Sequence, residues 1–171
     1  ISFSINLSGE MLSNPDAYNI ISSLLDKWHV PASKFIFEVI ETQAVTNLQS
    51  AHTLIQKIAE IGGQFALDDF GVGFSSMSYL KLLPVSYLKI DGRFIKNLAD
   101  SHEDYLFVNA INNVGQGMGL VTIAEFVENE QIIDILTEIG VDYVQGYGIG
   151  KPQAEPEFHT GPDSHHSLEI I

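Results

Sequence analysis

The sequence predicts an α/β fold of the TIM-barrel-like (β/α)8 type, incomplete, with about six of the eight strands present. Segments with the period-two alternation of a strand are followed repeatedly by segments with the 3.6-residue period of an amphipathic helix. Strands that alternate with helices form a parallel sheet with right-handed crossovers. An open doubly wound sheet also fits this alternation, and a complete barrel usually needs about 250 residues.

The first half of the chain carries three of the predicted strands. Asn14 is expected to be the N-cap, and Pro15 the first residue, of a helix that ends at Trp28. Gly62 ends the next helix, and Pro84 ends a short third one. The predicted elements are strand 1–7, helix 14–28, strand 35–41, helix 44–61, strand 64–69 and helix 75–83.

The second half repeats the alternation. Gly119 closes a long helix and Gly140 a second one, because glycine readily adopts the left-handed conformation that ends helices. The predicted elements are strand 85–91, helix 103–118, strand 120–125, helix 128–139 and strand 141–146.

The periodicity fades after Gly150. We therefore expect residues 1–152 to form one domain and residues 153–171 a C-terminal tail or linker. His165 and His166 lie in this tail, but two adjacent histidines without a third ligand are a weak sign of a metal site.

The composition limits the possible functions. The 171 residues include 8 lysines and arginines against 22 aspartates and glutamates, which gives a net charge of −14. Such a surface repels polymeric nucleic acid, so we expect no DNA or RNA partner. The absence of cysteine excludes disulfides and thiolate metal sites. No apolar run reaches the roughly 18 residues of a membrane span, and a first residue other than Met predicts a piece of a longer polypeptide.

A polar side chain stands at or near the carboxyl end of every predicted strand. Buried parallel strands are normally continuous apolar runs, and a lone aspartate after a strand is usually a helix cap or turn residue. Six strand ends in succession that carry such residues favour a functional site, because the loops after the strands of a barrel meet on one face. The residues are Asn6, Glu38, Asp68, Asp69, Lys89, Asp91, Glu125 and Gln145.

Carboxylates dominate this set, and four of them cannot lie together ionised without cations. Glu38, Asp68, Asp69 and Glu125 offer the oxygen ligands that hard divalent ions prefer, and Asn6 can add a carbonyl oxygen. Two such ions can clamp the attacking and leaving oxygens of a phosphoryl displacement. Each of the adjacent aspartates would then serve a different ion.

Lys89 has two interpretations. It could orient an attacking water or offset negative charge in the transition state, or it could form a salt bridge with Asp68 or Asp69. Both can hold at once, because an ammonium group can serve both purposes.

The glycines of GVGFSS, residues 71–76, do not have the spacing of a phosphate-binding loop. We expect instead a mobile loop after the aspartates, with Gly71 and Gly73 permitting unusual backbone angles. Ser75 or Ser76 would cap the next helix.

Six motifs occur in order and at suitable spacing: INLS, FEVIET, DDFGVGFSS, YLKIDGRFI, TIAEFVEN and VQGYGIGKP. Together, over residues 1 to about 152, they closely resemble the EAL-type cyclic-di-GMP phosphodiesterases of bacteria. The resemblance implies a variant of the (β/α)8 barrel that hydrolyses one phosphodiester bond of cyclic di-GMP to give linear pGpG. It also implies two Mg²⁺ or Mn²⁺ ions.

The resemblance further assigns roles to individual residues. Glu41 resembles the glutamate that anchors the loop after the aspartates, and Gln145 looks like a residue of the metal and water site. The implied metal ligands are Asn6, Glu38, Asp68, Asp69 and Glu125. The implied catalytic residues are Lys89, Glu125 and Asp69. The implied substrate-binding residues are Ser8, Glu128, Gly146 and Pro152.

Two features depart from the family pattern. Phe126 replaces the glycine of the usual AEGVE, although Glu125 and Glu128 are kept. The strand that carries the E-A-L glutamate would precede INLS and is not among these residues, so we expect the chain alone to hydrolyse cyclic di-GMP poorly. The alternatives are a catalytically inactive cyclic-di-GMP receptor or regulatory scaffold, and an unrelated open-sheet nucleotide-binding protein.

The resemblance also implies partners and a location. We expect a homodimer whose contacts involve the loop over residues 71–76, and a cyclase-like or sensory domain upstream in the parent protein. The domain itself is expected to be cytoplasmic.

Overall fold

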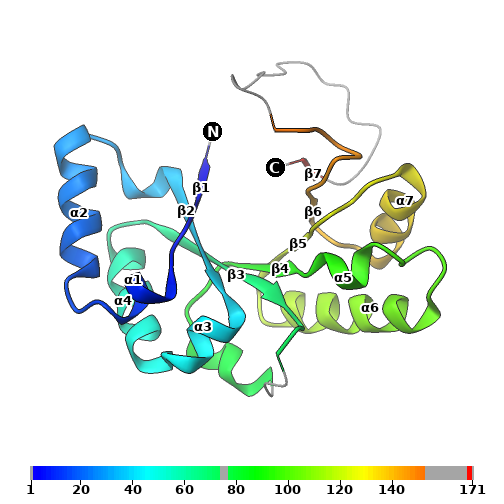
Figure 1. Ribbon diagram of the computed structural model, residues 1–171, viewed down its shortest axis with the longest axis horizontal. Coiled ribbons are helices and arrows are strands. Elements are labelled where there is room, and N and C mark those ends of the chain that lie inside the picture. Colours follow the sequence, from blue (N-terminus) through cyan, green and yellow to red (C-terminus); the bar gives the residue numbers. More distant parts are fainter. Residues whose placement is uncertain (1, 74–76, 153–168, 171) are drawn as a thin grey trace. The chain divides into compact units, whose positions relative to one another are not determined.

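The computed structural model describes residues 2–73, 77–152 and 169–170, and the chain divides into two compact units, Ile1–Lys89 and Ile90–Ile171. Both units combine parallel strands with helices (Figure 1). Within the part of the chain that is described, no helix is both long and apolar enough to cross a membrane.

The first unit is built on neighbouring parallel strands. They are β1 (Phe3–Asn6), β2 (Phe35–Ile40) and β3 (Gln64–Phe70), followed in the chain by β4 (Tyr87–Ile90). The register places Asn6 opposite Glu38, and Ile40 opposite Asp68. Parallel pairing in this register brings the carboxyl ends of β1, β2 and β3 to the same edge of the unit.

Helices cover this part of the sheet and form the core with it. They are α1 (Gly9–Ser13), α2 (Ala17–Trp28), α3 (Glu41–Thr46) and α4 (Leu48–Glu60), with short 3-10 turns η1 (Ala32–Lys34) and η2 (Met77–Leu82). Figure 1 shows α1, α2 and α4 gathered on one side of β1 and β2. Ile55 and Ile58 of α4 are fully buried, as are Phe65 and Leu67 of β3, the strand that α4 contacts.

The predicted start of the second helix is wrong. Asn14 does not cap it but ends α1, and the Asn14 Oδ1 accepts a hydrogen bond from the backbone N–H of Asp16 at 2.9 Å. The α2 helix therefore begins at Ala17. Asparagine readily makes such local bonds to the backbone, so it ends one element as easily as it starts another.

The helix predicted over residues 44–61 is two helices, α3 and α4, that meet at Asn47. The backbone of Asn47 leaves the helical region, with φ −117° and ψ 39°. Its side-chain amide donates to the carbonyl of Gln43 at 3.3 Å. The same carbonyl also accepts the helical hydrogen bond from the backbone N–H of Asn47 at 3.1 Å. The asparagine side chain therefore adds a second donor at the last turn of α3, and such local bonds favour a helix end.

The second unit also has parallel strands. They are β5 (Val121–Ala124), β6 (Tyr143–Val144) and β7 (Glu169–Ile170). Its helices are α5 (Gly92–Ile95), α6 (His102–Gly117) and α7 (Glu130–Ile139), and α5 lies beside α6 (Figure 1). The strand β7 lies in the segment predicted as a tail, whose residues 153–168 and 171 fall outside the described ones.

A buried polar network ties β5 to α6 in this unit. The Thr122 hydroxyl donates to Asn112 Oδ1 at 2.6 Å, and the Asn112 amide donates to the carbonyl of Ile139 at 3.0 Å. The backbone N–H of Thr122 donates to Asp142 Oδ2 at 2.7 Å. Because buried polar groups are costly without partners, this network fixes the strand against its helix.

Candidate functional site

A buried ion-pair cluster lies at the carboxyl edge of the first unit. Lys89 Nζ is 2.9 Å from Glu38 Oε2 and 2.9 Å from Asp68 Oδ1. Lys89 is only 3% exposed. The salt bridge to Asp68 considered from the sequence is confirmed, and Glu38 is a second partner that the sequence did not indicate.

Asn6 and Asp69 flank this cluster. Asn6, the last residue of β1, is the direct neighbour of Glu38 across the strand pair. Asp69 has a φ of 55°, and its backbone N–H donates to Asp68 Oδ1 at 3.1 Å. Left-handed residues other than glycine are uncommon and cluster at functional sites.

The first unit therefore offers a cation site made of hard oxygen donors. Glu38 and Asp68 already share one positive charge, the ammonium of Lys89, which shows that their oxygens converge on a common point. Asp68 and Asp69 are among the residues whose carboxylates could hold a metal ion. Carboxylate and amide oxygens fit Mg²⁺ or Mn²⁺ better than a soft metal.

Glu41 stands at the start of α3 and is 2% exposed. Its Oε2 accepts hydrogen bonds from the backbone N–H groups of Gly71 at 2.9 Å and Gly73 at 3.5 Å. Its Oε1 accepts one from the phenol of Tyr79 at 2.5 Å. Glu41 thus ties the turn after Asp69 to α3. The predicted cap at Ser75 or Ser76 lies outside the described residues.

Tyr79 was not indicated by the sequence, since an apolar-looking position in a short helix gives no sign of a buried hydroxyl partner. Burial, together with the hydrogen bond and the charge of Glu41, raises the pKa of the Tyr79 phenol well above its ordinary value. The phenol therefore keeps its proton throughout the physiological pH range and can act as a donor.

The second unit holds its own predicted site residues around a pocket of about 320 Å³. Glu125 follows β5 directly, and the backbone N–H of Gln145, just after β6, donates to the carbonyl of Ala124 at 2.9 Å. Parallel pairing of β5 and β6 thus places the two side chains at one edge of the unit. The pocket is lined by Lys96, Glu125, Phe126, Glu128, Gln145, Gly146 and Tyr147.

Phe126 lines this pocket and has an unusual backbone conformation. Its φ is 54°, in the left-handed region, and its side chain is 53% exposed. Lys96 Nζ lies 4.6 Å from the centre of its ring, close enough for a cation–π contact. A Cβ placed on Gly92 would lie 2.2 Å from the ring, so the phenyl group packs against a position where only glycine fits.

Phe126 and Gly92 are expected to be energetically coupled. Gly92→Ala should lower the free energy of unfolding by about 1–3 kcal/mol, because the new methyl group overlaps the Phe126 ring. In a Phe126→Gly background the same substitution should cost at least about 0.5 kcal/mol less. Urea unfolding of the wild type, the two single variants and the double variant measures the coupling. The control is Gly150→Ala, because a Cβ added there would meet nothing within 4 Å. Equal costs in both backgrounds would contradict this packing.

Ser8 and Pro152 are the remaining predicted residues. Ser8 caps α1, and its Oγ accepts from the backbone N–H of Met11 at 3.2 Å. Pro152 is exposed. Neither lines the pocket of the second unit.

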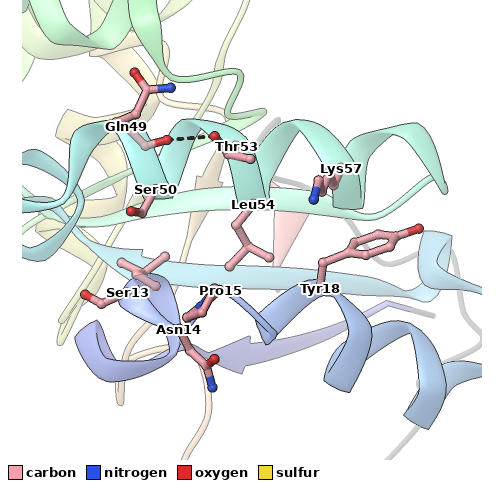
Figure 2. Close-up of a pocket in the computed structure, with 10 residues that line it drawn as sticks. Ser13, Asn14, Pro15, Tyr18, Gln49, Ser50, Thr53, Leu54 and Lys57 are labelled. Carbon is pink, nitrogen blue, oxygen red and sulfur yellow. Dashed lines mark hydrogen bonds between the residues drawn. The ribbon is translucent and has the colours of Figure 1, made fainter.

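A separate pocket of about 300 Å³ lies between α1, α2 and α4 of the first unit. Figure 2 shows Tyr18 and Lys57 at one end of it and Ser13 and Gln49 toward the other. Lys57 Nζ lies 5.6 Å from the centre of the Tyr18 ring. None of the residues that the sequence singled out as site residues lines it.

Known proteins resemble this chain over most of its length. The family model described as the EAL domain matches residues 1–152. The cyclic di-GMP phosphodiesterase PdeB of Shewanella oneidensis is 46% identical over 150 residues, which are 88% of this chain and 18% of that protein. PdeF of Escherichia coli, also a cyclic di-GMP phosphodiesterase, is 41% identical over 151 residues, 88% of this chain and 20% of that protein.

Solved structures of proteins with the same domain also resemble this chain. The MucR phosphodiesterase of Pseudomonas aeruginosa, solved as a c-di-GMP complex, matches with a TM-score of 0.84 and 33% identity. The match covers 88% of this chain and 61% of that one. The FimX EAL domain of the same organism, bound to c-di-GMP, matches with a TM-score of 0.84 and 26% identity, covering 88% and 62%.

The chain thus spans about a fifth of the length of the phosphodiesterases named above and about three fifths of the two solved chains. The α/β, TIM-barrel-like fold class predicted from the sequence is confirmed by the structural matches. The chain belongs to the EAL domain family.

Proposed function

We propose that this protein hydrolyses cyclic di-GMP to linear pGpG. The observation that carries the proposal is the placement of Lys89 between Glu38 and Asp68 at the carboxyl edge of parallel strands, in a chain of the EAL family. In the reaction, a water oxygen bonds to phosphorus as the bond from phosphorus to the ribose 3′ oxygen breaks. The proton that the water loses ends on that leaving oxygen.

Lys89 is the proposed catalytic residue. Its ammonium is held in place by two carboxylates and is shielded from bulk water, so it needs no reorganisation to face developing negative charge. It would orient the attacking water and offset the charge on the phosphate oxygens. Glu38 and Asp68 hold the ammonium group in place through contacts of 2.9 Å each.

Divalent cations complete the proposed site. Asn6, Glu38, Asp68, Asp69 and Glu125 are the proposed ligands for two Mg²⁺ or Mn²⁺ ions. Bound there, the ions would supply charge stabilisation for the phosphoryl group. These ions suit the site because all of the proposed ligand atoms are oxygens. Two of the carboxylates, Glu38 and Asp68, already lie against a positive charge, the ammonium of Lys89.

Substrate contacts are proposed for Ser8, Glu128, Gly146 and Pro152, and a place at the metal and water site for Gln145. Support comes from the pocket of the second unit, to which Glu128, Gln145 and Gly146 contribute. This pocket would take part of the dinucleotide, because it combines polar groups with the exposed aromatic rings of Phe126 and Tyr147.

The test is a chromatographic assay of pGpG formation with Mn²⁺ or Mg²⁺, with and without EDTA. We expect slow hydrolysis, because the sequence already predicts poor turnover by this chain, and we expect EDTA to abolish it and added Mn²⁺ to restore it. Binding of cyclic di-GMP, measured by calorimetry, without any pGpG would identify a receptor instead. If the protein neither binds nor hydrolyses cyclic di-GMP, the proposal is overturned and an unrelated function is favoured.

A further inference from the structure

We propose that Tyr79 is a positioning residue: its phenol holds Glu41 in the orientation in which that carboxylate fixes the turn after Asp68 and Asp69. The inference rests on the proposed function, because it concerns the geometry of the same site. Tyr79 itself is not placed among the residues that touch the reacting atoms.

The two oxygens of Glu41 have different partners. Oε1 accepts from the Tyr79 hydroxyl at 2.5 Å, whereas Oε2 accepts from the backbone of Gly71 at 2.9 Å and, more weakly, of Gly73 at 3.5 Å. Glu41 is 2% exposed and Tyr79 6% exposed. Because water has little access to either group, removing the phenol hydroxyl would leave Oε1 without its donor and free the carboxylate to turn.

The turn held by Oε2 has an unusual backbone. Gly71 has a φ of 102°, and Asp69, only two residues earlier, has a φ of 55°. Glycine adopts a positive φ freely, whereas a residue with a side chain, such as Asp69, keeps one only where its surroundings determine it. The hydrogen bond from Gly71 to Glu41 is therefore positioned to keep Asp68 and Asp69 in their observed conformations.

The donor is itself firmly placed. Tyr79 belongs to η2, where its neighbour Leu80 is 1% exposed, and Leu83, just after η2, is 4% exposed. The raised pKa of its buried phenol means that it donates, and the Glu41 carboxylate can only accept. The chain of contacts thus runs in one direction, from η2 through Glu41 to the turn beside the aspartates.

Tyr79→Phe removes only the hydroxyl. We expect kcat for cyclic di-GMP hydrolysis at saturating Mn²⁺ to fall about tenfold, with little change in KM, as is typical when a residue that orients a metal-binding group is lost. The control is Tyr87→Phe in the same unit, whose phenol makes a long 3.5 Å contact with Gln64. That variant should retain the kcat of the wild type.

A readout independent of substrate separates this inference from the proposed function. Amide hydrogen exchange by NMR should be several-fold faster at Gly71 and Gly73 in Tyr79→Phe than in the wild type, and unchanged in Tyr87→Phe. If the wild type does not hydrolyse cyclic di-GMP, the proposed function fails. The exchange experiment still decides whether Tyr79 and Glu41 hold the turn at Gly71.

Glu41→Gln supplies a second variant, since it weakens the same bonds but leaves the Tyr79 ring in the core. The Tyr79→Phe/Glu41→Gln double variant should lose no more kcat than the worse single variant, because both act through one carboxylate. Additive losses, a kcat unchanged in Tyr79→Phe, or unchanged exchange at Gly71 would each overturn the proposal. If Tyr79→Phe fails to fold, the exchange rates and kcat of Glu41→Gln decide the outcome.

Discussion

Replacing Lys89 with methionine is expected to lower hydrolysis of cyclic di-GMP by at least about 10²–10³-fold and to destabilise the fold. The loss of activity follows from removing a fixed positive charge beside the proposed reacting phosphate. The loss of stability follows because Glu38 and Asp68, which both lie 2.9 Å from the ammonium, become a pair of uncompensated acidic groups. Breaking such a buried pair typically costs about 3–5 kcal/mol.

Divalent cations should separate the two effects of Lys89→Met. Mn²⁺ can neutralise the same carboxylates, so it should restore part of the free energy of unfolding but none of the activity. Urea unfolding with and without Mn²⁺, together with the pGpG assay, measures both quantities. Lys57→Met, an exposed lysine of α4, is the matched control and should retain stability and activity. Wild-type turnover in Lys89→Met would remove the lysine from the proposed mechanism.

Gly146→Ala is expected to have the second-largest effect, by disrupting the pocket of the second unit. A Cβ at this position would lie 2.3 Å from both the backbone nitrogen and the backbone oxygen of Val127. Neither atom can move as a side chain can, so the backbone at Val127 or at position 146 must shift. Overpacking of this kind should cost about 3 kcal/mol in unfolding free energy, and KM for cyclic di-GMP should rise about tenfold or more.

The matched control for this prediction is Gly117→Ala. Its added Cβ would meet nothing within 4 Å, and Gly117 lies at the end of α6. Alanine there should leave stability unchanged or raise it by up to about 1 kcal/mol, because glycine is a poor helix former. Unfolding curves and KM values for the two variants give the comparison. A Gly146→Ala protein as stable as the wild type would show that the approach to Val127 is not close.

The sequence determined the alternation of strands and helices and the family motifs, because both are local patterns. The ends of the six predicted strands lie within about two residues of the observed ends, and the alternation predicted the fold class correctly, whereas β7 (Glu169–Ile170) was not predicted. Glycine at the end of α7 behaved as expected: Gly140 is left-handed, with a φ of 83°. The predicted helix bounds were wrong at Asn14 and Asn47. An asparagine side chain can bond to the nearby backbone at the end of a helix as well as at its start, so the residue type does not decide between the two.

Motif spacing also singled out Lys89, Glu38 and Asp68 as site candidates, but it could not show which of them share a hydrogen bond. Only the tertiary structure paired Lys89 with Glu38, because 51 residues separate the two and only strand register brings them together. The same holds for Tyr79 and Glu41, which lie 38 residues apart. Sequence periodicity reports which face of an element is buried, whereas the partner of a buried polar group depends on how separate elements pack, and packing is settled only when the chain folds.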